Sequence, residues 1–288
     1  MSICRILVPM SAAEVSLPAL ETAVALATRF GSHVEALHVR ADPKSLVPYA
    51  GEGMNGSMIE EIMDVTEREG SDRAHRARAT FDKFVADKGI RLVNGPGGAS
   101  GVSISWREEL GREDEVVALR GRVADLTVVG RPVRDAPLPS PITLEAALLE
   151  TGRPILITPP GGSPTVATHC AVAWEGSTEA ARAINGALDI LGKAERVTIV
   201  TGVGSAEPPL PPEECQEYLA WHGIKGEVHR FDPKDMEIGH ALLAEAMKVK
   251  SDLLIKGAYS QSRLKQMILG GRTRHIIANT QIPVLLAH

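Results

Sequence analysis

Glycine, hydroxyl and basic residues gather in one stretch near the end of the sequence. A strand-like run ends at Gly257, and after a loop the glycine pair Gly270 and Gly271 precedes a helix-like segment. Side chains that could contact an anion accompany these glycines: Ser260, Ser262, Arg263, Lys265, Arg272 and Thr273. The start of a helix offers unpaired N–H groups and a positive dipole end, and glycine lets a phosphate approach the main chain without a Cβ in the way. The stretch therefore predicts a phosphate site, unless the glycines only make a tight connection and the basic residues form a solvated face.

Two further positions are expected beside this stretch because of where parallel strands end. Ligand crevices of open parallel sheets lie at the carboxyl ends of the strands. Gly202 ends one strand-like run and Glu175 follows another, so both are expected at the same edge as Gly257. Trp174 is the bulky neighbour of Glu175, and it either stacks on a bound base or fills the pocket.

The strands and helices that would position these residues are written twice in the chain. Each half opens with a strand, a helix and a second strand: 5–9, 16–30 and 34–39 in the first half, and 170–174, 178–191 and 196–200 in the second. The closing strands match as well: 124–130 parallels 251–257, and 153–157 parallels 282–286. Gly31 and Gly192 are expected to end the two opening helices.

This order of elements predicts the fold class. Strands that alternate with helices imply parallel sheets with right-handed crossovers. We expect an α/β protein with two tandem doubly wound, Rossmann-like domains at 1–160 and 166–288, separated by the Pro- and Gly-rich segment 159–164. The first copy carries an extra region at 42–70. This region is expected to be a surface helix and loop that feeds a charged helix at 71–88, and a partner contact is the alternative.

Composition excludes several classes of protein. The 31 Lys and Arg residues against 36 Asp and Glu give a formal charge of −5, so the basic surface typical of nucleic-acid binding is missing. Neither a basic amphipathic face nor an apolar run of roughly 20 residues indicates a membrane. The chain opens without a signal peptide, and its three cysteines predict neither a disulfide framework nor a zinc site. The expected location is cytoplasmic.

The glycine-containing stretch resembles the nucleotide loop of the universal stress protein family, written G-x-x-G, nine residues, then G-[S/T]. Gly257 takes the place of the first glycine and Gly270 that of the third. One bacterial branch of the family is closer still, with G-A-Y-G-x-S-R, then G-G-x-T-R, and a turn A-W-[D/N]-G-S that is similar to residues 173–177. The resemblance covers essentially the whole chain as two copies, and its distinctive motifs lie in the second.

The resemblance implies a mostly parallel five-stranded sheet in each domain and dimer-like pairing. It also implies ATP or AMP binding in some members, with Mg²⁺ as the ion that would accompany the nucleotide. By the same resemblance Glu175 would meet the adenosine, and residues near Gly202 would contact the base. Ribose and phosphates would be contacted by Gly257, Gly270 and Gly271.

Both copies depart from the family pattern, and the first copy departs further. In the second copy Ser260 stands where a glycine is expected, and Gly271 stands where Ser or Thr is usual, with Thr273 able to supply a hydroxyl. In the first copy Ser11 replaces the acidic residue. The loop after Gly130 is rich in proline, which lacks the main-chain donor that a phosphate would need. The first copy is therefore expected to bind no nucleotide and to pair with the second.

No nucleophile–base pair or ligand-spaced cluster stands out, although His240 and His275 are both expected near the second loop. The leading interpretation is a stress-response binding protein that holds ATP or AMP in its second domain and is not an enzyme. The alternatives are a nucleotide-free interaction module and, third, a nucleotide-hydrolysing or adenylating enzyme. Internal pairing of the domains is expected through the aliphatic segments 155–157 and 284–286, with a homodimer left open.

Overall fold

The structure is a computed structural model that describes residues 3–43, 56–96, 101–133, 138–203, 208–258 and 271–288, with the main chain alone for 271–274. The first half contains β1 (Arg5–Pro9), α1 (Leu17–Phe30), β2 (His33–Arg40), α2 (Gly56–Lys88), β3 (Arg91–Leu92), β4 (Ser103–Leu110), α3 (Glu113–Gly121), β5 (Leu126–Gly130), α4 (Pro141–Glu150) and β6 (Ile155–Thr158). The second half contains β7 (His169–Ala173), α5 (Thr178–Lys193), β8 (Arg196–Gly202), α6 (Pro212–Trp221), β9 (Gly226–Phe231), α7 (Ile238–Lys248), β10 (Leu253–Gly257), α8 (Gly271–Asn279) and β11 (Val284–Ala287).

The strands form one continuous sheet rather than two separate ones. Its order is β3-β4-β2-β1-β5-β6-β11-β10-β7-β8-β9, eleven strands in all. Within each half the neighbouring strands are parallel, which confirms the predicted doubly wound α/β architecture. The difference from the expected five strands in each domain is that the first half contributes six strands, and the two sheets are continuous through their terminal strands.

The merging point is an antiparallel pair between β6 and β11. Val284 lies opposite Ile157, Leu285 opposite Leu156, and Leu286 opposite Ile155. All of these side chains are buried. The pairing joins the two aliphatic segments that the sequence offered, because each would otherwise be an exposed hydrophobic edge.

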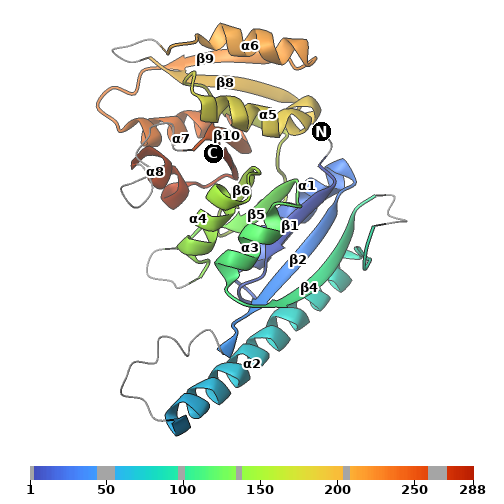
Figure 1. The fold of residues 1–288 in the computed structure, drawn as a ribbon. Coiled ribbons are helices and arrows are strands. Elements are labelled where there is room, and N and C mark those ends of the chain that lie inside the picture. Colours follow the sequence, from blue (N-terminus) through green and yellow to red (C-terminus); the bar gives the residue numbers. More distant parts are fainter. Residues whose placement is uncertain (1–2, 44–55, 97–100, 134–137, 204–207, 259–270) are drawn as a thin grey trace.

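Helices cover both faces of the sheet (Figure 1). One core cluster joins the sheet to α1, α2, α5 and α6, and the other joins it to α3, α4, α7 and α8. The inner strands are mostly aliphatic because both faces are buried, as in β5 and β10, although β5 contains Thr127 and β10 contains Lys256. This layering places the carboxyl ends of the strands at the rims, where the connecting turns and helix starts meet.

The ends of α1 and α5 and the length of α2 can be compared with what the sequence predicts. Gly31 ends α1 in the left-handed conformation, with φ +69°, as expected. Gly192 does not end α5, which continues to Lys193 and has Ala194 as its C-cap. The helical pieces expected in the region 56–88 form one uninterrupted helix, α2. Its C-terminal half packs against the sheet, and its N-terminal half extends past the sheet (Figure 1).

Candidate functional site

Three of the expected site residues meet at one edge of the second half. Gly202 is the last residue of β8, Gly257 is the last residue of β10, and Glu175 follows β7 by two residues. In the sheet β7 lies between β10 and β8. The chain leaves β7 toward β8 on one side while β10 lies on the other, so this edge is a topological switch point where α/β proteins bind ligands.

Gly257 is required by packing, apart from any ligand. A Cβ at this position would lie 2.4 Å from the main-chain nitrogen of Ala180 and 2.5 Å from the carbonyl carbon of Glu179. Both atoms belong to the first turn of α5, which therefore sits directly on the end of β10. The family resemblance implies that Gly257 contacts ribose and phosphates; the close approach that the structure shows at this position is that of a helix.

Gly202 is likewise closely packed. A Cβ there would lie 2.9 Å from Cδ1 of Ile238, at the start of α7, and 3.4 Å from the Phe231 ring. The first of these contacts is with the end of a flexible side chain, so the end of β8 has some room to adjust. The space beside Gly202 is filled by apolar side chains in this structure.

Trp174 fills the crevice instead of standing free in it. Its side chain is 8% exposed, and the indole Nε1 donates a hydrogen bond of 2.9 Å to the carbonyl oxygen of Leu210. The same short loop approaches Gly176, where a Cβ would lie 3.1 Å from the Leu210 nitrogen. Gly176 has φ +71°, a conformation that favours glycine. Of the two roles offered by the sequence, the structure places Trp174 in the filling role.

Glu175 takes part in the start of α5. The Ser177 hydroxyl donates to Oε1 of Glu175 at 3.1 Å and accepts a hydrogen bond from the Ala180 N–H at 3.1 Å. Ser177 is therefore the N-cap of α5. Its hydroxyl holds the Glu175 carboxylate beside the positive end of the helix dipole, and the carboxylate and the helix stabilise each other. A ligand hydroxyl would have to compete with Ser177 for one carboxylate oxygen.

The remaining predicted residues are only partly described. Ser260 and Gly270 lie outside the residues that the structure describes. Gly271, Arg272 and Thr273 form the first turn of α8, with only their main chain described. The helix therefore begins at Gly271, the second glycine of the pair, whereas both glycines were expected to precede it.

The sequence analysis missed Lys256 as a site residue. This lysine is only 5% exposed, and its Nζ donates a hydrogen bond of 2.6 Å to the carbonyl oxygen of Gly257. The ammonium group is therefore held at the carboxyl end of β10. Because neighbouring residues of a strand point to opposite faces, Lys256 points to the α7–α8 face while Gly257 faces α5. The available signal was a lone charged residue at the end of an otherwise aliphatic strand.

His240 and His275 are also brought together on this face, from α7 and α8. Their ring centroids lie 5.2 Å apart, with the ring planes inclined at 32°. His240 is exposed and His275 is half-buried. The sequence placed both near the second loop, and the structure adds that they are neighbours.

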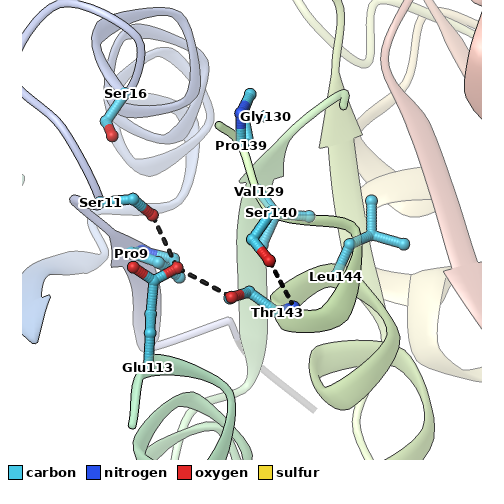
Figure 2. Close-up of a pocket in the computed structure, with 10 residues that line it drawn as sticks. All are labelled: Pro9, Ser11, Ser16, Glu113, Val129, Gly130, Pro139, Ser140, Thr143 and Leu144. Atoms are coloured by element: carbon cyan, nitrogen blue, oxygen red, sulfur yellow. Dashed lines mark hydrogen bonds between the residues drawn. The ribbon is translucent and has the colours of Figure 1, made fainter. Parts of the chain in front are cut away.

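The equivalent edge of the first half contains a small pocket with a different lining (Figure 2). Glu113, the first residue of α3, points into it, and its Oε1 accepts hydrogen bonds from Ser11 at 2.7 Å and Thr143 at 2.9 Å. Pro139 packs over Gly130, so that a Cβ on Gly130 would lie 2.8 Å from the proline Cγ. A carboxylate and a proline ring thus occupy this crevice.

The two halves can be aligned through one aspartate in each. Asp125 accepts hydrogen bonds from the N–H groups of Cys4 and Arg5 at 2.8 and 3.0 Å. Asp252 does the same for Thr168 and His169 at 3.0 and 2.9 Å. Each aspartate therefore ties the start of its strand to the first strand of its half.

Counting from these aspartates shows that the two crevices differ in charge. Lys256 stands where the first half has Val129, and His240 stands where it has Glu113. The second crevice thus has a buried ammonium and an imidazole at positions where the first has an aliphatic side chain and a carboxylate.

Comparison with known proteins agrees with this architecture. A universal stress protein from Archaeoglobus fulgidus superposes with a TM-score of 0.64 over 100% of this chain and 99% of that chain, at 16% sequence identity. A candidate universal stress protein from Pseudomonas aeruginosa gives 0.57 over 99% and 93%, at 15% identity. The chain has the universal stress protein fold. At these identities the likeness concerns the fold alone.

Comparison of the sequence itself assigns the chain to no family. No protein-family model matches the sequence. No curated protein matches it either. Within the described residues, the helices include none that is both long and apolar enough to cross a membrane.

Proposed function

We propose that the second half binds an adenine nucleotide, ATP or AMP, with its phosphates between Lys256 and the start of α8. The observation that carries this proposal is the buried ammonium group of Lys256 at the carboxyl end of β10. Lysine is rarely buried without a partner for its charge, because removing the charge from water is costly. The ammonium group already donates to the carbonyl oxygen of Gly257, and a phosphate at the same edge would add an anion beside it.

The contrast between the halves supports a single site per chain. Val129 replaces Lys256 in the first half, and Glu113 places a carboxylate where a phosphate would have to lie. Pro139 covers Gly130 and brings no main-chain N–H. In this proposal the first half binds no nucleotide and serves as the internal partner of the second half, as a second subunit would.

The proposed role is that of a stress-response binding protein in the cytoplasm, in which nucleotide occupancy is the signal. Mg²⁺ would arrive with the nucleotide. No group of three or more His, Cys, Asp or Glu side chains suited to a metal ion exists among the described residues. Among the residues described at this edge, none pairs a nucleophile with a base, so binding rather than hydrolysis or adenylation is the function that these side chains support.

Calorimetric titration with ATP and AMP, with and without Mg²⁺, tests the proposal. We expect one nucleotide per chain, and binding about ten- to hundredfold weaker in Lys256→Met, because a hydrogen bond to a charged group contributes about 1.5–3 kcal/mol. Lys225→Met is the matched control, since Lys225 is exposed and remote from this edge in the sheet order. Equal affinity in wild type and Lys256→Met would refute the assigned position of the phosphates.

One observation favours a second candidate, a nucleotide-free interaction module. Trp174 fills the crevice and is hydrogen-bonded to Leu210, and the loop at 208–211 approaches Gly176. A base could enter only if this loop or the indole moved. Absence of heat and of any thermal shift at millimolar ATP and AMP would support this candidate over the nucleotide site.

A further inference from the structure

The contact between α7 and α8 holds two imidazole rings side by side. The ring centroids of His240 and His275 are 5.2 Å apart. Among the described residues neither ring takes part in a hydrogen bond or ion pair. Both rings are therefore held by their helices while their nitrogen atoms are left available, and the exposure of His240 gives solvent access to the pair.

From this arrangement we infer that His240 and His275 form a two-histidine site for a divalent transition metal ion, for which Zn²⁺ is the probe. Imidazole nitrogen is a favoured ligand of zinc, with a nitrogen–zinc distance of about 2.0–2.1 Å. That distance puts each ring centroid about 3.2 Å from the ion, so two rings at a tetrahedral angle have centroids about 5.2 Å apart. The observed spacing fits, and the torsion that turns a histidine ring about its Cβ–Cγ bond is broad.

In the first half, the residue at the position of His240 makes a contact between two helices. Glu113, the counterpart of His240, reaches from α3 across to Thr143 of α4 with a hydrogen bond of 2.9 Å. In the second half the same position faces a second imidazole in place of a hydroxyl. A metal ion there would join α7 to α8 as the Glu113–Thr143 bond joins α3 to α4.

The protein supplies two ligands and leaves the other positions of the ion open. No third His, Cys, Asp or Glu completes the site among the described residues, so water fills the remaining positions. Its two ligands do not include Lys256, on which the proposed nucleotide site rests, and Zn²⁺ can be titrated in the absence of nucleotide. Its outcome can therefore be separated from that of the proposed nucleotide site.

Nuclear magnetic resonance of the histidine rings tests the site directly. The full chain labelled with ¹⁵N is titrated with ZnCl₂ without nucleotide, and the ring nitrogen signals are followed. We expect two histidines to shift together at the lowest zinc concentrations. Their signals should be those that disappear in His240→Ala and His275→Ala.

Calorimetry with Zn²⁺ supplies the second measurement. Either substitution should weaken binding at least about tenfold, because the second ligand of a pair binds at a high effective concentration. His222→Ala and Cys4→Ser are the matched controls, since both residues are exposed and belong to other elements, and each should retain the wild-type affinity. An affinity for Zn²⁺ that is unchanged in both His240→Ala and His275→Ala would overturn the inference. So would a titration in which the ring nitrogen signals of other histidines shift first.

Discussion

Arg29 and Lys193 donate hydrogen bonds to each other's main chain. The guanidinium Nη2 of Arg29 lies 2.9 Å from the carbonyl oxygen of Lys193, and Nζ of Lys193 lies 2.9 Å from the carbonyl oxygen of Arg29. The two residues stand at the ends of α1 and α5, which occupy equivalent places in the two halves. Each cation thus satisfies a carbonyl in the last turn of the other helix, where a positive charge also favours the helix dipole.

We expect Arg29→Met to lower the free energy of unfolding by about 1.5–3 kcal/mol, because the charged donor is lost from several acceptors at once. Besides Lys193, the guanidinium donates to the Val166 carbonyl at 3.2 Å and to the Thr168 hydroxyl at 3.1 Å. Urea unfolding measures the change. Arg182→Met is the control, because Arg182 is 59% exposed and its ion pair with Glu179 is long, so it should change stability by less than about 0.5 kcal/mol.

Gly257→Ala should destabilise the protein by about 1–3 kcal/mol, since the new methyl would collide with the main chain of α5 at Ala180. Gly192→Ala should instead stabilise the protein. No atom lies within 4 Å of a Cβ built on Gly192, and alanine is favoured over glycine within a helix by about 0.5–1 kcal/mol. The midpoint temperatures of thermal unfolding of the two variants measure this difference. A shift of both midpoints in the same direction would contradict this explanation of Gly257.

The sequence was sufficient for the more aliphatic strands and for the two segments that pair in β6 and β11, because aliphatic runs and helical spacing are local signals. It did not place β3, β4 and β9, which carry more polar residues and lie at or next to the edges of the sheet. It could not reveal that Gly257 is needed by α5 or that Trp174 donates to Leu210, since both depend on contacts between distant segments. The extension of α5 past Gly192 follows from its neighbours, which supply enough packing to outweigh one unfavourable residue. The sequence alone could not show that Lys256 is buried. Its place was recognised from the low exposure of its side chain in the structure and from the alignment of the two halves.

Stability should fall as the pH drops below about 6.5. Burial lowers the pKa of His33, and the charges around it add smaller effects of both signs. Burial also lowers the pKa of His169, followed by the charge of Arg196. The folded protein therefore disfavours the charged rings, while the unfolded chain takes up protons near the usual value of about 6.5. The contribution is present above that pH and is lost as the pH falls.

Unfolding in urea at pH 7.5 and at pH 5.5 measures this effect. His33→Gln with His169→Gln should reduce the loss of stability between the two pH values, because two proton-binding differences are removed. His222→Gln is the exposed control and should keep the wild-type loss. A double variant as sensitive to acid as the wild type would contradict the assignment.

Thiol chemistry should single out Cys4 in the folded protein. Cys4 is exposed, whereas Cys170 and Cys215 are buried, and burial raises the pKa of both thiols to about 12. Only the thiolate reacts with alkylating reagents. Iodoacetamide at pH 8 should modify one cysteine, identified by peptide mass spectrometry, and all three after unfolding. Rapid native labelling of Cys170 would show that β7 opens readily.

The antiparallel joint between β6 and β11 gives the molecule two chemically different poles. Strands run parallel from β1 through β5 to β6, and from β11 through β10 to β7, so reversal at the joint points the two sets of carboxyl ends in opposite directions. Glu113 marks one pole and Lys256 the other. A partner that recognises one end by its charge will therefore always meet the same half of the chain, so the tandem chain has a defined orientation.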